Sequence, residues 1–248
     1  MKLYSSKPQA SITMGISPAL RQLLAHTIAA FRPGVVIESG TYIGLGSTTL
    51  LAELLQETFP EHTPRLFTLE VSFAHWQQAA RNLRRFRHVR CLWGLSVDRD
   101  EARRFILNDP VLNRHESEPD IYVDNVEDPV RFYLDEVDGR LLDPDAVPGD
   151  FIRKALFREQ WLPRLLGRYG ARRPLVTLDS AGGIGFLEFN TVTRLLKDHP
   201  YLLLLDDIDH LKHFRSRRAV HADPCFDVLG EEPETGWLLA RHNPARGA

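Results

Sequence analysis

Short apolar runs alternate with longer amphipathic stretches along most of this chain. Between the runs, apolar residues recur at helical spacing, which predicts helices over 17–31, 47–59, 73–86 and 186–196. The apolar runs themselves predict five buried strands. They are VVIES (35–39), RLFTLE (65–70), HVRCLWGLSVD (88–98, which runs into a turn), RPLVTLDSAGG (173–183) and PYLLLLDD (200–207).

The order of these elements indicates an α/β fold. Strands that alternate with helices favour a mostly parallel, Rossmann-like, doubly wound sheet with helices on both of its faces. Ser17 and Pro18 suit the N-cap and first position of the first helix. Near the C-terminus, FDVLGEE and GWLLARH predict a closing hairpin. We therefore expect a single domain over 1–248, with 1–32 as an N-terminal helical extension.

One region departs from this rhythm. About 75 residues separate the third and fourth strands, more than such a connection usually needs. Residues 116–150 hold twelve Asp and Glu against two Arg, and residues 151–173 hold seven Lys and Arg against one Glu. We expect 108–150 to be an inserted lid or interaction segment. A basic helix over 153–173 is expected to pack on the sheet through Ile152, Leu156, Trp161 and Leu165.

Composition and charge narrow the setting. With a net charge of −2, the chain has no global attraction to nucleic acid or to an anionic membrane. No apolar run approaches the roughly 20 residues of a membrane span. The first residues lack the apolar core of a signal peptide, and Cys91 and Cys225 have no nearby cysteine partner. We expect a cytoplasmic protein that meets neither nucleic acid nor membrane.

The first strand runs into a glycine-rich turn. Glu38 ends the apolar run, glycines follow at 40, 44 and 46, and Ser47 starts a helix. Such a turn brings backbone N–H groups and a helix N-terminus to a ligand. The order G-x-x-x-G-x-G after an acid differs from the G-x-G-x-x-G of nicotinamide-binding proteins. No G-x-x-x-x-G-K-[ST] or G-x-S-x-G motif is present.

Polar residues follow the other predicted strands. Glu70 ends the second strand and can accept hydrogen bonds from ribose hydroxyls. The third strand is followed by Gly94, Leu95 and Ser96, the fourth by Asp179, and the fifth by Asp206 and Asp207. Ligands of parallel sheets bind beyond the carboxyl ends of the strands, so these residues are expected to line one site.

The three aspartates predict a cation site. Adjacent strands lie about 5 Å apart, so Asp179, Asp206 and Asp207 can approach one point. Crowded carboxylates repel unless a cation or protons neutralise them, and oxygen ligands suit Mg²⁺ or Ca²⁺. The alternative is that these residues cap a helix or bond loop amides. His210 is a candidate metal ligand or general base.

These motifs resemble the class I S-adenosylmethionine-dependent methyltransferases. ESGTYIGLGST resembles the first motif of that family, and the resemblance extends from about residue 17 to 242 apart from the insertion. It implies the strand order 3-2-1-4-5-7-6 and S-adenosylmethionine as cofactor. It also implies a cofactor site that comprises Glu38, Gly40, Thr41, Gly44, Ser47, Glu70, Gly94, Ser96 and Asp179.

Within that superfamily, LDS (178–180) and LDDIDH (205–210) look most like the macrocin O-methyltransferase and cephalosporin hydroxylase-like group. That likeness implies Mg²⁺ held by Asp179, Asp206 and Asp207, with His210 and Asp179 as catalytic residues. DSAGGIGFLEFN departs from the D-G-x-H sequence common there. The expected activity is O-methylation of a small hydroxylated molecule with divalent-metal assistance.

Three alternatives stay open at this point. The chain could keep the fold without catalysis and act as a binding or interaction protein through its acidic insertion. It could also be a cephalosporin-hydroxylase-like enzyme, which would need iron and an oxidant. A nucleic-acid methyltransferase is poorly motivated because the Asn/Asp-Pro-Pro-Tyr type of motif is missing. The sequence leaves homo-oligomerisation open.

Overall fold

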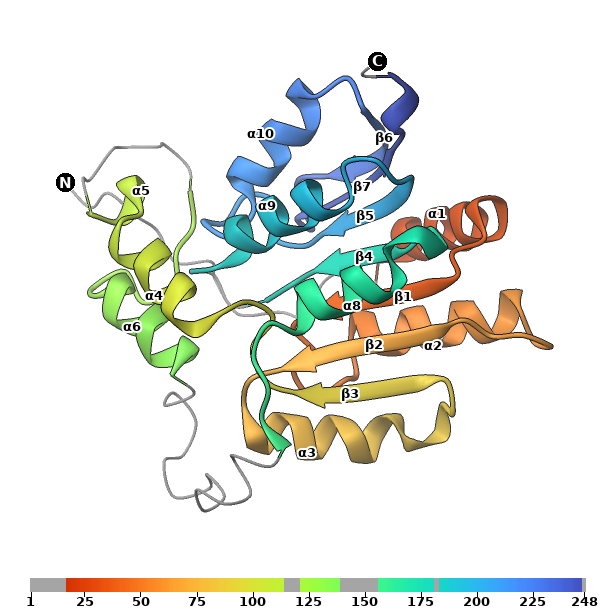
Figure 1. Cartoon of the computed structure of the whole chain (residues 1–248), viewed down its shortest axis with the longest axis horizontal. Coiled ribbons are helices and arrows are strands. Elements are labelled where there is room, and N and C mark those ends of the chain that lie inside the picture. The colour runs from red at the N-terminus through yellow and green to blue at the C-terminus, as the bar shows by residue number, and fades with distance from the viewer. Residues whose placement is uncertain (1–16, 114–120, 139–155, 181–182, 247–248) are drawn as a thin grey trace.

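A single mixed sheet organises the chain. The computed structural model describes residues 17–113, 121–138, 156–180 and 183–246. Seven strands among these residues form a sheet in the order β3-β2-β1-β4-β5-β7-β6, which confirms the predicted fold class and strand order (Figure 1). Strands β1 to β5 pair in parallel, and β7 is antiparallel to both β5 and β6. The bounds are β1 (Val35–Ser39), β2 (Arg65–Glu70), β3 (Val89–Trp93), β4 (Leu175–Leu178), β5 (Tyr201–Leu205), β6 (Phe226–Glu232) and β7 (Trp237–His242).

Helices cover both faces of this sheet. Successive side chains of a strand point to opposite faces, so Val36 lies in the core on one face and Ile37 in the core on the other. The first core is covered by α1 (Pro18–Phe31), α2 (Ser47–Thr58) and α3 (Phe73–Asn82). The second is covered by α8 (Trp161–Tyr169), α9 (Gly185–Leu195) and α10 (Phe214–Ala222). The described residues also form the short 3-10 helices η2 (Leu83–Arg85), η4 (Gly170–Arg172) and η5 (Pro244–Arg246).

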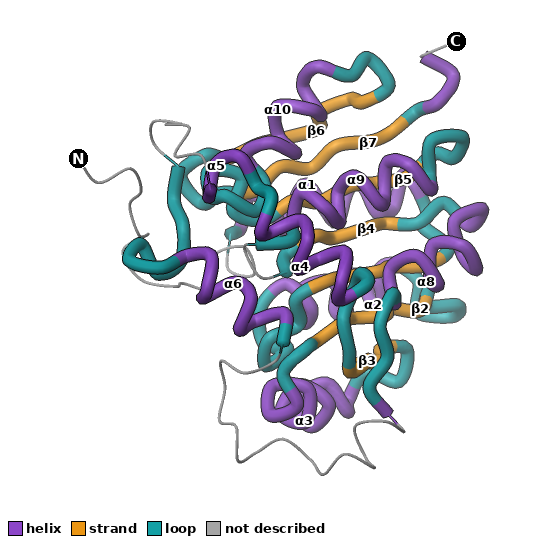
Figure 2. The backbone as a smooth tube through the Cα atoms, turned by 60° about the vertical axis from the view of Figure 1, so that its left-hand side comes forward, coloured by secondary structure: helices purple, strands orange, loops and turns teal. Residues whose placement is uncertain are grey.

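A third hydrophobic core joins the segment between β3 and β4 to later parts of the chain. Its residues come from α4 (Arg99–Leu107), α5 (Pro110–Asn113) and α6 (Pro129–Val137), and from the later residues Ile184, Leu187, Leu211 and Phe214. Both views place α4 beside α6, and Figure 1 shows them beyond the carboxyl ends of the parallel strands (Figures 1 and 2). Tyr133 has no exposed surface, and its hydroxyl accepts a hydrogen bond from the Asp124 N–H at 2.9 Å. Residues 121–138 are therefore a folded cover over one edge of the sheet.

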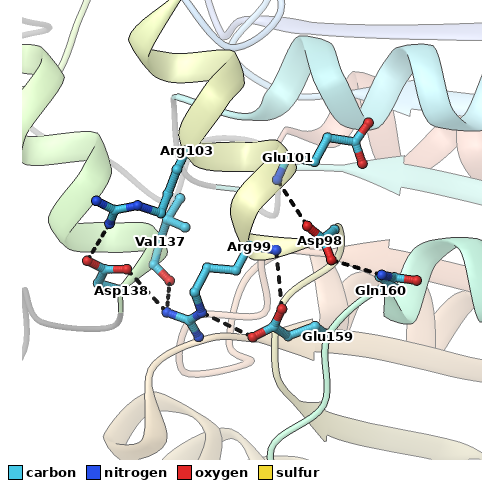
Figure 3. Close-up of polar contacts among 8 residues, drawn as sticks. All are labelled: Asp98, Arg99, Glu101, Arg103, Val137, Asp138, Glu159 and Gln160. Carbon is cyan, nitrogen blue, oxygen red and sulfur yellow. Dashed lines mark hydrogen bonds and ion pairs between the residues drawn. The ribbon is translucent and has the colours of Figure 1, made fainter.

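A polar network fastens this cover to the rest of the domain (Figure 3). Arg99 Nη1 donates to the carbonyl of Val137 at 2.9 Å, and Arg99 Nε donates to Glu159 Oε1 at 3.0 Å. Asp98 accepts a hydrogen bond from Gln160 Nε2 at 2.9 Å. One arginine thus joins the start of α4, the end of α6 and the segment before α8.

The third strand ends at Trp93 and is followed by Gly94, Leu95 and Ser96, as predicted. The backbone beyond Trp93 pairs with the segment before α8. The Leu95 N–H, for example, donates to the Arg158 carbonyl at 3.0 Å. For the same reason residues 157–160 are not helical, and the continuous helix predicted over 153–173 is interrupted. Leu156 is 52% exposed, so its predicted packing on the sheet is wrong, whereas Leu165 is buried in the second core.

Some predictions fall outside the described residues. These are residues 1–16 of the N-terminal extension, residues 114–120 and 139–150 of the insertion, and Ile152. Within the extension, α1 packs on α2, and Ser17 Oγ accepts the Leu20 N–H at 3.3 Å, as a helix cap does. No helix in the described ranges combines the length and apolarity that a membrane span requires.

Candidate functional site

The carboxyl ends of five adjacent strands, β1 to β5, bring the predicted site residues to one edge. The hydrogen-bond ladder continues just past the strands, which fixes each residue relative to its neighbour. The backbone N–H groups of Gly40, Gly94, Asp179 and Asp206 donate to the carbonyls of Leu69, Glu70, Ser39 and Leu178 at 2.9 to 3.1 Å. The helices α4 and α6 cover this same edge, so the candidate site lies between the strand ends and these two helices (Figures 1 and 2).

The glycine turn touches β4 so closely that a side chain has no room. Gly40 has φ +85°, and a Cβ there would lie 1.9 Å from the carbonyl oxygen of Asp179. Gly44 has φ +75°, and its Cβ would lie 2.7 Å from Leu83 Cδ1. Helix α2 begins at Ser47, so its unpaired N–H groups lie next to the turn. The N–H groups of Gly40, Thr41, Tyr42 and Gly44 are bonded within the chain, so the donors that remain at this edge are those at the start of α2.

Glu38 anchors this turn from below. Its carboxylate has no exposed surface and accepts hydrogen bonds from the hydroxyls of Ser47, Thr48 and Thr68 at 2.7, 2.6 and 2.7 Å. Burial raises the pKa of Glu38 to about 7, although the three hydroxyl bonds act to lower it. Glu38 and Ser47 thus join the end of β1, the start of α2 and the middle of β2. Thr41, in the turn, hydrogen-bonds the same Thr68 hydroxyl.

Glu70 links the end of β2 to the glycine turn. Its Oε2 accepts the Tyr42 N–H and its Oε1 accepts the Ser72 N–H, both at 2.8 Å. Burial raises its pKa to about 7 against these two backbone bonds. Each carboxylate oxygen has a second lone pair, so Glu70 can accept a further pair of hydroxyl donors. Its position and free acceptors fit the predicted ribose-binding role.

The loop after β3 is held by other parts of the chain. Gly94 has φ +150°, and a Cβ there would lie 1.8 Å from the Arg158 carbonyl oxygen. Ser96 belongs to a group of serines around a buried carboxylate, Glu188 on α9. Burial raises the pKa of Glu188, and hydrogen bonds from the hydroxyls of Ser180, Ser96 and Ser39 lower it. The predicted contact of Gly94 and Ser96 with the cofactor stays a prediction.

The three predicted metal ligands do converge, but a lysine lies among them. Asp179, Asp206 and Asp207 each offer an oxygen within 4.8 Å of the others. Lys212 Nζ lies 2.8 Å from Asp179 Oδ1 and 2.8 Å from Asp207 Oδ2, with its side chain 8% exposed. Burial alone would lower the pKa of Lys212. The three nearby carboxylates raise it by more, so its pKa lies well above the usual value for a lysine. Lys212 is therefore an ammonium ion.

This arrangement does not fit a divalent metal. A Mg²⁺ ion requires oxygen ligands at about 2.0–2.1 Å in a near-octahedral set. The ammonium already donates to two of the three carboxylates, and a metal at the same place would meet a like charge in direct contact. As these side chains lie, two of the three predicted Mg²⁺ ligands, Asp179 and Asp207, are partners of Lys212.

His210 lies between the insertion and its own loop. The ring is buried, its Nδ1 accepts the Lys212 N–H at 3.3 Å, and its Nε2 lies 3.4 Å from Asp124 Oδ2. Tyr122 reinforces this contact, because its carbonyl accepts the Leu211 N–H at 2.9 Å. The insertion thus orients the predicted catalytic histidine. Its role as ligand or base stays a prediction.

The insertion also brings a carboxylate of its own. Glu136, on α6, has a pKa that burial raises to about 8, with Asp124 and Glu70 raising it further and Lys212 lowering it. Glu136 Oε2 is buried without a hydrogen-bond partner among the described residues. This electrostatic coupling indicates that α6 borders the same edge as Glu70 and Lys212.

Sequence reasoning missed Lys212 and Glu188. A signal for Lys212 exists, because the chain has only five lysines among many arginines and this one follows Asp207 by five positions. Glu188 stands alone in the apolar stretch GFLEFN at the start of a helix, which indicates a buried acid that needs partners. Neither signal reveals the partner by itself.

Comparison with known proteins gives likeness in overall fold. No family model matches this chain, and a search of curated proteins finds no match. Among solved structures, an O-methyltransferase from Bacillus cereus in complex with SAH has 14% identity and a TM-score of 0.49, over 93% of this chain and 83% of that chain.

Two further structures resemble the chain to a similar degree. TomG from Streptomyces achromogenes, an O-methyltransferase involved in tomaymycin synthesis and solved with SAM, has 14% identity and a TM-score of 0.47, over 93% of this chain and 82% of that chain. The calicheamicin methyltransferase CalS11 has 14% identity and a TM-score of 0.42, over 90% and 80%. At such low identity the chemistry has to be argued from this chain's own residues.

Proposed function

We propose that this protein is an S-adenosylmethionine-dependent methyltransferase that methylates a hydroxyl group of a small molecule. The observation that carries the proposal is the connection between the glycine turn and Glu70. The carboxylate at the end of β2 is aligned by the N–H of Tyr42 in the turn, at 2.8 Å. A ligand with a polar amino-acid part and a ribose would meet the N-terminus of α2 beside the turn and an acceptor at Glu70.

The charge of the site supports a cationic cofactor. Asp179, Asp206, Asp207 and Glu70 gather at one strand-end edge, and Lys212 is the cation among them. S-adenosylmethionine carries a positive sulfonium and an ammonium group. A site with excess negative charge attracts such a ligand more strongly than the negatively charged pyrophosphate of a dinucleotide.

For methyl transfer, the main task of the protein is to position the acceptor and the methyl donor. In an in-line displacement, the acceptor oxygen forms a bond to the methyl carbon, the carbon–sulfur bond breaks, and S-adenosylhomocysteine leaves. The hydroxyl proton passes to a base, for which His210 is our candidate. Its Nε2 faces the Asp124 carboxylate, so the proton would go to Nδ1 once that atom releases the Lys212 N–H. Holding the two reactants in line and excluding water supplies most of the rate. The cover formed by α4 and α6 suits that second task.

Calorimetry with S-adenosylhomocysteine tests the proposal. We expect the wild-type protein to bind it and to show no comparable affinity for NAD. In Glu70→Gln one oxygen becomes an amide, so the affinity should fall at least about ten-fold, as loss of a charge-assisted hydrogen bond predicts. Glu61→Gln, at an exposed surface position, is the matched control and should bind like wild type. Tight binding of NAD alongside no binding of S-adenosylhomocysteine would overturn the proposal.

A further inference from the structure

Lys212 stands where the predicted metal ion would have to be. Its ammonium is 2.8 Å from an oxygen of Asp179, which ends β4, and 2.8 Å from an oxygen of Asp207, in the loop after β5. Asp206 provides the third oxygen of the group. The lysine comes from the same loop as Asp207 and bridges it to the neighbouring strand.

We propose that Lys212 is the built-in cation of this carboxylate cluster and that the site works without a divalent metal ion. The ammonium neutralises one carboxylate charge and holds the ends of β4 and β5 together, as a metal ion would. The contacts of Lys212 with Asp179 and Asp207 are the reason that we exclude a metal ion from this cluster. The statement that methyl transfer needs no metal ion rests, in addition, on the proposed function.

The surroundings of Lys212 fix it in this position. A Cβ on Gly185, at the start of α9, would lie 2.7 Å from Lys212 Cβ and 2.6 Å from its carbonyl oxygen. The Lys212 N–H donates to the ring of His210, and the side chain is almost fully buried. The backbone is thus packed on both sides, and the aliphatic stem has little freedom to withdraw the ammonium from its carboxylates.

The residue type suits the place. An ammonium is a compact point charge, whereas a guanidinium is a wide planar fork that pairs with carboxylates side by side. The chain uses arginine far more often than lysine, and its lysines are Lys2, Lys7, Lys154, Lys197 and Lys212. A small cation that fits between carboxylate oxygens within 4.8 Å of one another explains a lysine here.

The net negative charge of the cluster also has a function. Three carboxylates and one ammonium leave the cluster with excess negative charge. That charge complements the sulfonium of S-adenosylmethionine. A divalent cation in the same cluster would cancel it.

Titration with Mn²⁺, followed by calorimetry and electron paramagnetic resonance, tests the inference without any cofactor. We expect wild-type protein to show no specific site. Lys212→Met removes the ammonium and keeps much of the side-chain volume, so it should gain one Mn²⁺ site at least ten-fold tighter than any wild-type binding. Adding Asp179→Asn to that variant should abolish the gain. Lys197→Met, at a lysine whose side chain is 74% exposed, is the control and should gain nothing.

A second measurement covers the case in which Lys212→Met does not fold. With only five lysines, the side-chain ammonium ¹⁵N signals of wild-type protein are assignable, and that of Lys212 should be slowly exchanging and unmoved by millimolar Mg²⁺. A wild-type Mn²⁺ site that disappears in Asp179→Asn, or an ammonium signal that shifts with Mg²⁺, would overturn the inference.

The two proposals fail separately. Absence of S-adenosylhomocysteine binding would remove the proposed function and leave the Mn²⁺ result standing. If methyl transfer is found, its rate should change less than two-fold on addition of EDTA, whereas a metal-dependent enzyme would lose nearly all activity.

A different observation concerns the opposite edge of the sheet, where β1 and β2 begin. A hollow of about 700 Å³ opens there between the end of α1, the start of β2 and the end of α8. No acidic residue lines it. The charged residues and histidine that line it, which we call the arginine hollow, are Arg32, His62, Arg65, Arg168 and Arg172.

The arginines of this hollow lack acidic partners among the described residues. None of the ion pairs formed in the described ranges includes Arg32, Arg65, Arg168 or Arg172. Arg168 and Arg172 instead flank the ring of Tyr169, at 5.3 and 5.4 Å from its centroid. Four like charges around one hollow repel one another, and a bound anion would relieve that repulsion.

We infer that the arginine hollow binds a small ligand with a chain of phosphate groups. Guanidinium groups pair with phosphate oxygens through two parallel hydrogen bonds, so four of them suit several linked phosphates. The volume lies in the range of small-molecule sites. The hollow is at the amino ends of the strands, so it is separate from the aspartate edge.

Inorganic tripolyphosphate is the probe, because it lacks the adenosine that the cofactor site would accept. We expect calorimetry at low salt to show one site that weakens at least five-fold between 50 and 200 mM salt, as phosphate contacts do. Arg65→Glu with Arg168→Glu should abolish it. Arg194→Glu, an exposed arginine on α9, is the control. Equal binding by the double variant, no wild-type binding, or stronger binding of RNA than of tripolyphosphate would overturn the inference.

Discussion

Glu38 and Glu70 are buried carboxylates whose partners are all within the chain. Three hydroxyls hold Glu38, and two backbone N–H groups hold Glu70. For both, burial outweighs the hydrogen bonds and raises the pKa to about 7. The native state therefore binds these protons more tightly than the unfolded chain, whose glutamates titrate near 4.5.

A pH-dependent stability follows for Glu38. Its pKa is raised on folding, so its contribution is fully present below pH 4.5 and is lost as the pH rises through about 7. The whole shift corresponds to on the order of 3 kcal/mol. In Glu38→Gln, the decline of unfolding free energy between pH 5 and 7 should become shallower, by up to about 1.4 kcal/mol per pH unit. Urea unfolding measures it, with Glu61→Gln as the control, and an unchanged slope would show that Glu38 does not titrate there.

The glycine turn offers a second residue-scale prediction. Gly40→Ala would force a Cβ to within 1.9 Å of the Asp179 carbonyl oxygen at φ +85°, so it should destabilise the fold by at least about 3 kcal/mol. Gly167→Ala, inside α8 with nothing within 4 Å of its Cβ, should stabilise by about 0.5–1 kcal/mol. Thermal and urea unfolding compare the two. Similar effects of both substitutions would mean that the turn is not pressed against β4.

At the scale of elements, the described part of the insertion is a docked cover. It buries Val123, Tyr133 and Val137 in the third core, and Arg99 joins α4, α6 and the segment before α8. Of its acidic residues, Asp138 pairs with both Arg99 and Arg103.

Arg99→Met should loosen this cover. The side chain is 21% exposed and bonds a carbonyl and a carboxylate, so its removal should cost about 1–3 kcal/mol and speed amide hydrogen exchange in α6. Arg131→Met, whose side chain is 80% exposed and pairs only with Asp135, should cost less than about 0.5 kcal/mol. Exchange in α6 that is equally fast in both variants would place the fastening elsewhere.

The sequence predicts the strands and the glycine turn well, and the side-chain contacts between loops poorly. Runs such as VVIES specify strands because β-branched residues fit a buried sheet, and Gly40 marks a turn that excludes side chains. The Lys212–Asp179 contact spans 33 positions and depends on the course of a loop in which Asp207 takes φ +53°. The spacing of apolar residues in the sequence does not predict the course of such a loop. The same holds for the segment 157–160, whose pairing with the residues after β3 interrupts the predicted helix.

At the scale of the whole molecule, the doubly wound sheet separates two charged regions. The carboxyl edge gathers Glu70, the aspartates and Lys212 beneath the α4–α6 cover. The amino edge holds the arginine hollow. A cationic cofactor and an anionic ligand would thus bind at opposite ends of the same strands, even though the net charge of the chain is only −2.

A crystal structure grown with S-adenosylhomocysteine and millimolar Mg²⁺ tests the central claim most directly. We predict that the amino-acid part of the ligand lies at the Gly40–Gly44 turn and that its ribose hydroxyls bind Glu70. We also predict that Lys212 still lies between Asp179 and Asp207. A ligand bound away from the glycine turn, or a Mg²⁺ ion coordinated by the three aspartates with Lys212 displaced, would contradict it.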